Sequence, residues 1–343
     1  MRANLLIKPG QIELREIETP SPEEGEVLVK VRAALTCGTD LKTFLRGHPK
    51  FPLPALFGHE FSGEIAKVGR NVKQFREGDS VMSAPSGPCG TCYFCQRQQE
   101  NICPAVMENY TLGAYAEYIK VPAHVVSQNM FEKPAELSFK EAAVLEPLAC
   151  VMHGLSMLKL REDDTVVIIG SGAIGLLHLL ALQALGLEKI IVLGRRPYRL
   201  EIARKLNAYR VVDFNEGQPH AREMILAATN GRGADVVIEC TGTPAVWESA
   251  INIARRGGEV VLFGGCKPGT TVTFDTQRLH YDQITLRSPF HLTRNSVRQA
   301  YELLAGSRLL ATSLITDTYP LDQLDQVFSL LQKGDCIKYA VIP

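Results

Sequence analysis

Four cysteines lie close together in the stretch CGTCYFCQRQQENIC. Cys89, Cys92, Cys95 and Cys103 are separated by two, two and seven residues, a spacing typical of metal-binding loops. Four thiolates complete the tetrahedral coordination of Zn²⁺ and leave no position for a substrate, so such a site stabilises a loop and does no chemistry. An iron–sulfur cluster is the alternative occupant of four cysteines, and metal analysis distinguishes the two. We expect a structural zinc site here.

A second set of potential metal ligands is dispersed along the first half of the chain. It consists of Cys37 in TCGTD, His59 and Glu60 in FGHEFSG, and Glu146 in VLEPLAC. A thiolate, an imidazole and carboxylates together make the mixed coordination that is expected where one position must stay open to water or substrate. From the residue types alone, a buried cysteine and solvated carboxylates remain the alternative interpretation.

A glycine-rich turn in TVVIIGSGAIG predicts a nucleotide site. Gly170, Gly172 and Gly175, with Ala173 and Ile174 between the last two, follow a predicted strand and open a predicted helix. The glycines permit a tight turn and bring a pyrophosphate to the helix N-terminus, where unpaired N–H groups and the helix dipole favour anions. The pattern alone is weak, but its position between a strand and a helix makes it specific.

The next predicted strand, KIIVL, predicts which nicotinamide cofactor binds. It ends at Gly194, where NAD-binding folds carry an acidic residue for the ribose 2′-hydroxyl, and Arg195, Arg196 and Arg199 follow. The missing carboxylate removes repulsion against a 2′-phosphate, and guanidinium groups bind phosphate through bidentate, charge-assisted hydrogen bonds. An exposed helix face would also carry arginines, but it does not explain Gly194. We expect NADP(H) to be favoured over NAD(H).

The elements that must position these residues fall into two domains. Residues 1–146 contain short apolar runs punctuated by Gly and Pro, which suits the short strands of a barrel-like fold. Residues 147–284 alternate strand and helix patterns, which is typical of a doubly wound parallel sheet. Residues 285–343 are expected to return to the first domain. A length of 343 residues agrees with two domains.

Composition excludes some partners. Lys plus Arg and Asp plus Glu both number 37, and the sequence pI is about 7.1, so the chain has no overall charge that would draw it to nucleic acid or to an anionic membrane. No apolar run reaches the roughly 20 residues of a membrane helix, and the N-terminus lacks a signal-peptide core. We expect a cytoplasmic protein with a small-molecule substrate.

Taken together, GHEFSGEIAKVGRNV, the four-cysteine loop and GSGAIG resemble the zinc-dependent medium-chain alcohol dehydrogenases, and most of all their sorbitol and threonine dehydrogenase branch. The resemblance covers the whole chain. It implies an α/β protein in which a GroES-like β-barrel catalytic domain accompanies a Rossmann domain, assembled as a homodimer or homotetramer. Cys37 and His59 match the first two ligands of that family's catalytic zinc, and Glu60 and Glu146 match the others. Ethanol-type relatives have Cys at the last position, so the EPL stretch favours polyol and threonine enzymes.

The resemblance also implies the reaction, the transfer of a hydride between a secondary alcohol or polyol, or the matching ketone, and a nicotinamide cofactor. The zinc ion lowers the pKa of the alcohol hydroxyl, as it does that of bound water. In similar enzymes a Ser or Thr two residues after the Cys ligand starts a proton relay that ends at a His, and here Thr39 matches the start while Lys42 replaces the His. Three roles are open for Lys42: accepting the proton, bonding the ribose, or being an ordinary surface lysine. His48, six residues further on, is an alternative end of the relay.

Three other interpretations are open at this point. A catalytically silent relative would use zinc and nucleotide for binding or regulation only. An NAD-dependent, threonine dehydrogenase-like enzyme would share the same ligands. Zinc-free quinone reductases of the same superfamily lack the four-cysteine loop, which makes them the least suitable of the three.

Overall fold

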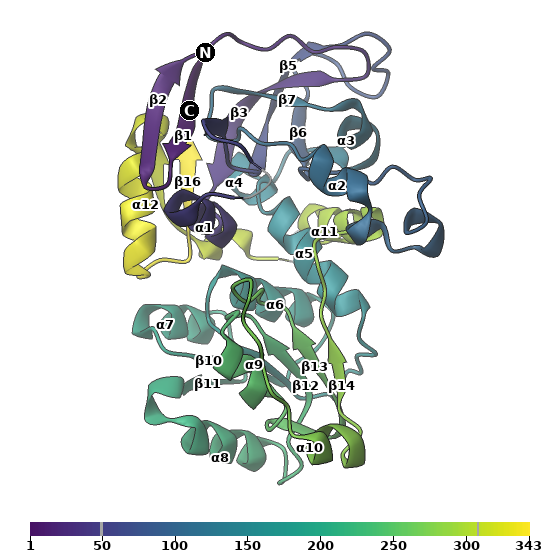
Figure 1. The fold of residues 1–343 in the computed structure, drawn as a ribbon, viewed down its shortest axis with the longest axis vertical. Helices are drawn as coiled ribbons and strands as arrows, with labels where there is room; N and C mark the ends of the chain where they lie inside the picture. The colour runs from purple at the N-terminus through teal and green to yellow at the C-terminus, as the bar shows by residue number, and fades with distance from the viewer. Residues whose placement is uncertain (49–50, 307–308) are drawn as a thin grey trace. The chain divides into compact units, whose positions relative to one another are not determined.

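The computed structural model describes residues 1–48, 51–306 and 309–343. The chain forms two compact units, one of residues 1–150 and 291–343 and the other of residues 151–290 (Figure 1). These divisions lie four and six residues beyond the boundaries at 146 and 284 that we expected from sequence texture. The first division falls inside a helix, where no change of composition marks it.

The first unit contains a seven-stranded sheet in the order β15-β16-β3-β5-β6-β8, with β7 also paired to β3. The strands are β3 (Val27–Leu35), β5 (Glu60–Val68), β6 (Ser80–Ser83), β7 (Tyr118–Val121), β8 (Met130–Glu132), β15 (Ile315–Pro320) and β16 (Lys338–Ile342). The C-terminal strand β16 pairs antiparallel with β3 near the N-terminus. The sheet of the first unit therefore contains strands from both the N-terminal and the C-terminal parts of the chain.

A smaller antiparallel sheet accompanies it, in the order β2-β1-β4. Its strands are β1 (Arg2–Lys8), β2 (Gln11–Glu16) and β4 (Ala55–Leu56). Aromatic rings fill the core of this unit: Tyr115 packs edge-on against Phe57 and Phe328. Such rings bury the largest apolar areas of any side chains, so this cluster contributes strongly to the stability of the barrel.

The described helices of the first unit are α1 (Gly38–Arg46), α2 (Pro104–Glu108), α3 (Ala123–Gln128), α4 (Phe139–Ala142), α5 (Leu145–Ser156, which crosses into the second unit), α11 (Arg294–Ala305) and α12 (Leu324–Lys333). Of these, α1, α5, α11 and α12 have nine or more residues, and the other three are shorter. Short 3₁₀ turns occupy Cys95–Arg97, Glu100–Ile102, Ala311–Leu314 and Leu321–Gln323.

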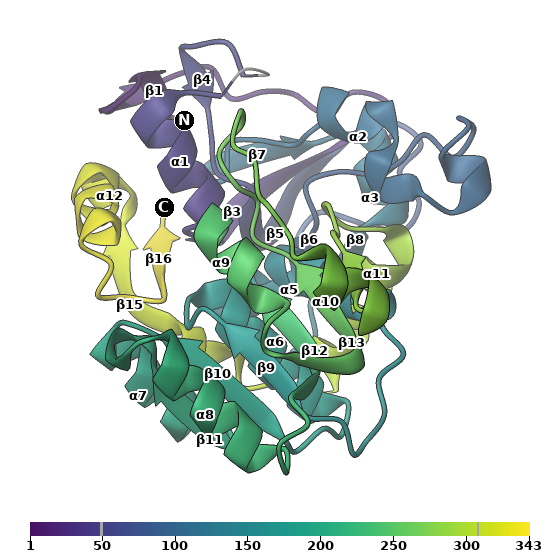
Figure 2. The same ribbon diagram turned by 60° about the horizontal axis from the view of Figure 1, so that its bottom comes forward.

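The second unit is built on six parallel strands in the order β11-β10-β9-β12-β13-β14. They are β9 (Val166–Ile169), β10 (Ile190–Gly194), β11 (Arg210–Asp213), β12 (Ala234–Glu239), β13 (Ala254–Leu262) and β14 (Thr285–Arg287). The helices are α6 (Ala173–Ala184), α7 (Pro197–Lys205), α8 (Gln218–Ala228), α9 (Pro244–Ala250) and α10 (Thr276–Tyr281), with a 3₁₀ turn at Phe214–Glu216. Figure 2 shows α7 and α8 beside β10 and β11.

All four residues of β9 are buried, as expected for a central strand covered on both faces. The strand order reverses between β9 and β12, and in open α/β sheets ligands bind at the carboxyl ends of the strands at such a point. The prediction of a GroES-like barrel together with a doubly wound parallel sheet is confirmed.

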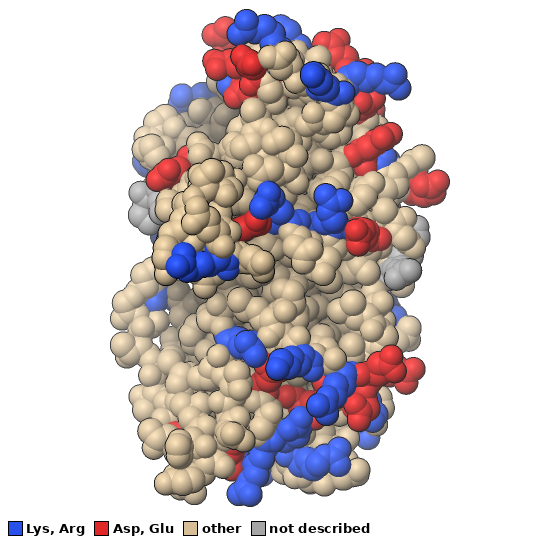
Figure 3. Space-filling model, turned by 90° about the vertical axis from the view of Figure 1, so that its right-hand side faces the viewer, with Lys and Arg blue, Asp and Glu red and all other residues tan. Residues whose placement is uncertain are grey.

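The surface agrees with the balanced charge of the sequence. Basic and acidic side chains are intermixed over the face drawn in Figure 3. Charged side chains of the second unit form ion pairs, such as Arg255 with Asp235 and Arg287 with Glu259. Among the described residues, no helix combines the length and apolar character needed to cross a bilayer.

Candidate active site

Cys37 lies where strand β3 passes into helix α1. It is the N-cap residue of α1, and its Sγ accepts a hydrogen bond from the backbone N–H of Thr39 at 3.4 Å. The positive end of a helix dipole and an N–H donor both favour an anionic ligand atom. The fold therefore presents Cys37 Sγ at the N-terminus of α1, in a position to ligate a metal ion.

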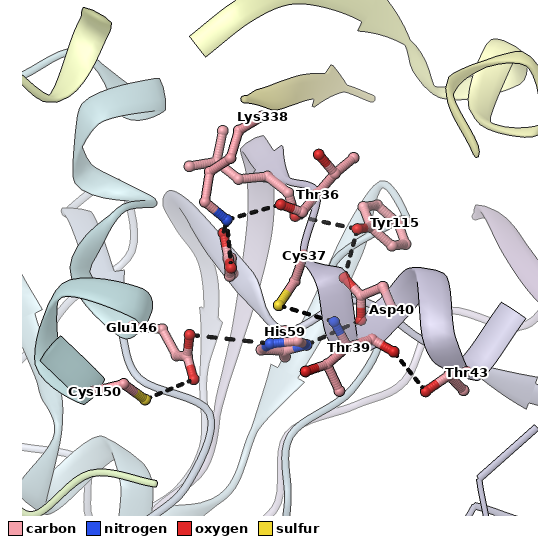
Figure 4. A network of polar contacts seen from close by, with 12 residues as sticks. Thr36, Cys37, Thr39, Asp40, Thr43, His59, Tyr115, Glu146, Cys150 and Lys338 are labelled. Carbon is pink, nitrogen blue, oxygen red and sulfur yellow. Dashed lines mark hydrogen bonds and ion pairs between the residues drawn. The ribbon is translucent and has the colours of Figure 1, made fainter. Parts of the chain in front are cut away.

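His59 is 4 % exposed and is held by a chain of hydrogen bonds (Figure 4). Its Nδ1 lies 3.1 Å from Asp40 Oδ1, and the other oxygen of Asp40 accepts from the Tyr115 hydroxyl at 2.7 Å. Burial lowers the pKa of His59, but the charges and hydrogen bonds of Asp40 and Cys37 together outweigh it and raise that pKa well above the usual value. A carboxylate on Nδ1 fixes the tautomer and directs Nε2 to a metal, as in the carboxylate–histidine–zinc arrangement.

Glu146 reaches toward the same place from the first turn of α5. Its Oε2 lies 4.0 Å from His59 Nε2, and its Oε1 accepts a hydrogen bond from Cys150 Sγ at 3.6 Å. The side chain is 6 % exposed. Neither of these two contacts is with a lysine or an arginine. A buried carboxylate close to an imidazole nitrogen is therefore suited to bind a divalent cation.

Glu60 has a cation of its own. Lys338, on strand β16, donates to both carboxylate oxygens at 2.6 and 2.5 Å and to the carbonyl of Thr36 at 2.8 Å. Burial raises the pKa of Glu60 to about 7, and Lys338 opposes that rise. Ligand atoms of Cys37, His59 and Glu60 still lie within 4.8 Å of one another, so Glu60 is a metal ligand only if it shares its charge with Lys338.

The two expected relay residues lie on the exposed side of α1. Thr39 and Lys42 are both exposed, and the carbonyl of Thr39 accepts a hydrogen bond from the hydroxyl of Thr43 at 2.9 Å. The ring of His48 stacks on Phe51 with centroids 4.2 Å apart. The structure thus gives none of these residues the buried setting that it gives His59.

The four predicted structural cysteines form one cage. The Sγ atoms of Cys92 and Cys95, and those of Cys89 and Cys103, are each 3.5 Å apart, and those of Cys89 and Cys95 are 4.0 Å apart. A Zn–S bond of about 2.3 Å gives tetrahedral S–S edges of about 3.8 Å. Hydrogen bonds from Thr91 and Cys92 lower the pKa of the Cys89 thiol to about 6, which favours the ligating form. This cage fits a single ion and has no room for a cluster of several irons.

Replacing Cys92 with Ala should remove one zinc ion per chain and chiefly lower stability, because a closed metal site contributes folding free energy. A loss of even about 2 kcal/mol lowers the melting temperature of a 150–250-residue protein by roughly 4–8 °C. Metal analysis and thermal melting measure both effects, with Cys266→Ala as a control outside every cysteine cluster. A Cys92→Ala protein with the zinc content and melting temperature of wild type would contradict this assignment.

The glycine-rich turn and the arginines line one cavity of about 590 Å³ in the second unit. Gly172 is the N-cap residue of α6, and Ala173 and Ile174 form its first turn. A Cβ on Gly175 would lie 1.8 Å from the carbonyl oxygen of Gly170, so only glycine permits the close approach of helix and strand. The cavity therefore combines a glycine-rich turn with a helix N-terminus, a form suited to an anion.

Gly194 ends strand β10 in tight contact with the glycine-rich turn. A Cβ there would lie 2.2 Å from Ser171 Oγ and 2.8 Å from Leu200 Cδ2. The guanidinium of Arg195 lies 5.1 Å from the centre of the Phe214 ring, and the carbonyl of Arg195 accepts from the Asn215 amide at 2.7 Å. These contacts hold Arg195 beside the position that an acidic residue would occupy in an NAD-binding fold.

Arg196 and Arg199 also line this cavity. Arg196 is the N-cap residue of α7. Arg199 approaches the turn, because its Nη1 lies 3.6 Å from where a Cβ on Gly172 would be. The cavity thus brings all three predicted arginines together with Gly170 and Gly172 of the glycine-rich turn.

Sequence reasoning did not find Asp40, Tyr115, Lys338, Cys150 or His291. The local signals available were that Asp40 follows Cys37 by three residues and that Cys150 follows Glu146 by four. Tyr115 and Lys338 reach the site only through the pairing of β16 with β3 and the packing of the barrel, which no short motif encodes.

Comparison with known proteins agrees with this geometry. Residues 23–130 match the alcohol dehydrogenase GroES-like domain, and residues 173–306 match the zinc-binding dehydrogenase family. The chain is 33 % identical to sorbitol dehydrogenase of Bacillus subtilis, over 100 % of this chain and 97 % of that protein. It is also 33 % identical to L-threonine 3-dehydrogenase of Bacillus velezensis, over 96 % and 95 % of the two chains.

A solved structure shares the whole fold. It is a zinc-binding dehydrogenase of Sinorhizobium meliloti bound to NADP, with a TM-score of 0.91, 30 % identity and coverage of 100 % of this chain and 99 % of that one. The chain is an oxidoreductase of the alcohol and polyol dehydrogenase type. It belongs to the zinc-dependent medium-chain alcohol dehydrogenase family, in the branch of the sorbitol and threonine dehydrogenases.

Proposed function

We propose that the protein oxidises a secondary alcohol or polyol, or reduces the matching ketone, with NADP(H) as the favoured cofactor. The single observation that carries the proposal is the ligand set in the first unit, where Asp40 directs His59 toward Cys37 and Glu146. A catalytically silent relative that bound zinc would keep the same ligands, because burial of charge is costly without a partner, so turnover is what distinguishes the two.

Cys37, His59 and Glu146 would hold the catalytic zinc, with Glu60 as an exchanging ligand. When bound, zinc supplies Lewis acidity that lowers the pKa of a hydroxyl, and NADP supplies the hydride acceptor. The chain's own residues hold the ligands in place. Asp40 and Tyr115 fix the ring of His59, and Lys338 neutralises Glu60 inside the barrel. The four-cysteine loop would hold a second, structural zinc.

Gly170, Gly172 and Gly175 would hold the pyrophosphate at the start of α6, and Arg195 would be the main ligand of the 2′-phosphate, with Arg196 and Arg199 assisting. The supporting observation is that Gly170, Gly172 and the three arginines line one cavity in which position 194 has no space for a carboxylate. The proposal includes a homodimer or homotetramer, as the branch implies.

L-Threonine is a second candidate substrate, because the sorbitol and threonine dehydrogenases match this chain at the same identity and threonine is itself a secondary alcohol. A panel of sugars, polyols and amino alcohols that includes L-threonine, followed by nicotinamide absorbance, tests the proposal. Turnover of threonine alone with NAD(H) would replace the polyol and NADP(H) proposals with the threonine one.

Replacing Lys42 with Ala should raise the KM for the cofactor and leave the shape of the pH–rate profile unchanged. Lys42 is exposed on α1, five residues after Cys37, and a contact of its ammonium group with the cofactor ribose is the role we propose for it. Lys42→Arg, which keeps the charge, should restore most of the cofactor affinity. A loss of kcat that is largest at low pH, with rescue by small amine buffers, would instead make Lys42 the proton acceptor.

A further inference from the structure

Glu146 stands between two groups of metal-ligating side chains in the first unit. One carboxylate oxygen, Oε2, lies 4.0 Å from His59 Nε2, and the other, Oε1, lies 3.6 Å from Cys150 Sγ. Figure 4 shows the two oxygens directed to opposite sides, one to His59 and one to Cys150. The contact with His59 uses only one of the two carboxylate oxygens.

The second side is completed by His291. Ligand atoms of Glu146, Cys150 and His291 all lie within 4.8 Å of one another. Cys150 follows Glu146 by four residues on α5, so the helix fixes their separation. His291 comes three residues before α11 and has a positive φ of 59°, an uncommon conformation for a residue other than glycine.

A buried serine holds the imidazole in place. Ser86 Oγ lies 2.6 Å from His291 Nε2, and Ser86 is fully buried. A metal-bound histidine typically has its other ring nitrogen fixed by such a hydrogen bond, which sets the tautomer and the ring orientation. The ring of Tyr110 lies between the two groups, with its centroid 5.7 Å from that of His59 and 5.8 Å from that of His291.

We propose that Glu146, Cys150 and His291 form an additional divalent-metal position, in which Glu146 bridges to the Cys37 and His59 position through its second oxygen. A thiolate, an imidazole nitrogen, here Nδ1, and a carboxylate oxygen select zinc or cobalt over magnesium or calcium. Carboxylate-linked ions in two-metal enzymes lie about 3.5–4 Å apart, and each protein ligand set leaves a position for solvent or substrate. On metal binding, the Cys150 thiol releases its proton to solvent.

The additional position should bind more weakly than the four-cysteine cage, because it has three ligands and shares one of them. The proposal rests on the proposed function only through that shared Glu146. It is therefore tested by metal uptake, with Co²⁺ added to metal-free protein and followed by the thiolate-to-cobalt absorption and by metal analysis. Wild type should bind three equivalents, two tightly and one more weakly.

Cys150→Ser and His291→Asn should each lose the weak equivalent and keep the two tight ones. Asn suits position 291 because it tolerates a positive φ. Cys266→Ser, a cysteine outside every cluster, should bind three equivalents as wild type does. Wild-type uptake by both Cys150→Ser and His291→Asn at every cobalt concentration would overturn the additional position.

Cys37→Ser separates this proposal from the proposed function. It should lose one tight equivalent and retain the uptake that depends on Cys150. If Cys37→Ser retained every equivalent while Cys150→Ser lost one, the additional position would stand and the catalytic assignment of Cys37 would fail. If only Cys37→Ser lost metal, the reverse would hold.

Discussion

Replacing Cys37 with Ala should reduce alcohol turnover by at least about 10³-fold while leaving a folded protein. A metal ion supplies several kcal/mol of charge stabilisation in the transition state, and each 1.36 kcal/mol is a factor of ten in rate. Cys37 is the N-cap residue of a helix at the edge of the barrel, outside the aromatic core around Tyr115, so its removal does not open a cavity there.

The measurement is kcat on a substrate from the panel, together with circular dichroism and metal content. Cys266→Ala is the matched control, because it removes a thiol that lies outside the metal clusters, and its kcat should equal that of wild type. The contrast with Cys92→Ala is informative, since that change should lower stability more than turnover. A Cys37→Ala enzyme with near-normal kcat would exclude Cys37 as a catalytic ligand.

The second large effect concerns the cofactor. The wild-type enzyme should prefer NADP(H), and the triple variant Ser171→Gly, Gly194→Asp, Arg195→Ser should prefer NAD(H). A hydrogen bond to a charged group contributes about 1.5–3 kcal/mol, so loss of Arg195 alone should reduce the preference roughly ten- to a hundredfold. The new carboxylate would repel a 2′-phosphate and accept hydrogen bonds from a 2′-hydroxyl.

Ser171 must change with Gly194 for a steric reason. A Cβ at position 194 would lie 2.2 Å from Ser171 Oγ and 2.9 Å from Ser171 Cβ. Gly194→Asp alone should therefore weaken binding of both cofactors by displacing the glycine-rich turn. Arg204→Ser is the matched control: Arg204 is half exposed, pairs with Glu201 and should not affect the preference. Preference of the wild type for NAD(H) by tenfold or more, about 1.4 kcal/mol, would refute the assignment.

Local motifs predicted those parts of the site whose ligands lie close together in sequence or carry a family pattern. The four cysteines are separated by a few residues, and their cage follows from that spacing. The glycine-rich turn was predicted because strand, turn and helix are consecutive. Cys37, His59 and Glu146 required the family resemblance, because they come from the end of one strand, the start of another and a helix 86 residues beyond His59.

The rest depends on long-range packing. Lys338 neutralises Glu60 only because the C-terminal strand enters the sheet beside β3, and His291 reaches Glu146 only because the chain returns to the first unit after β14. Gly194 ends β10 and lies close to Ser171, in the turn that follows the adjacent parallel strand β9, and this close approach explains an absent carboxylate by the lack of space. The sequence showed that position 194 lacks the acidic residue of NAD-binding folds. The structure adds a steric reason for glycine at this position to the electrostatic one.

The initial rate of nicotinamide reduction by zinc-loaded wild type, with NADP and NAD at equal concentrations over the alcohol panel, tests the central claim most directly. We expect at least one secondary alcohol or polyol to be oxidised, with a kcat/KM for NADP above that for NAD. Absence of absorbance change with either cofactor, in both the alcohol and the ketone direction, would contradict the claim and leave a zinc- and nucleotide-binding protein without turnover.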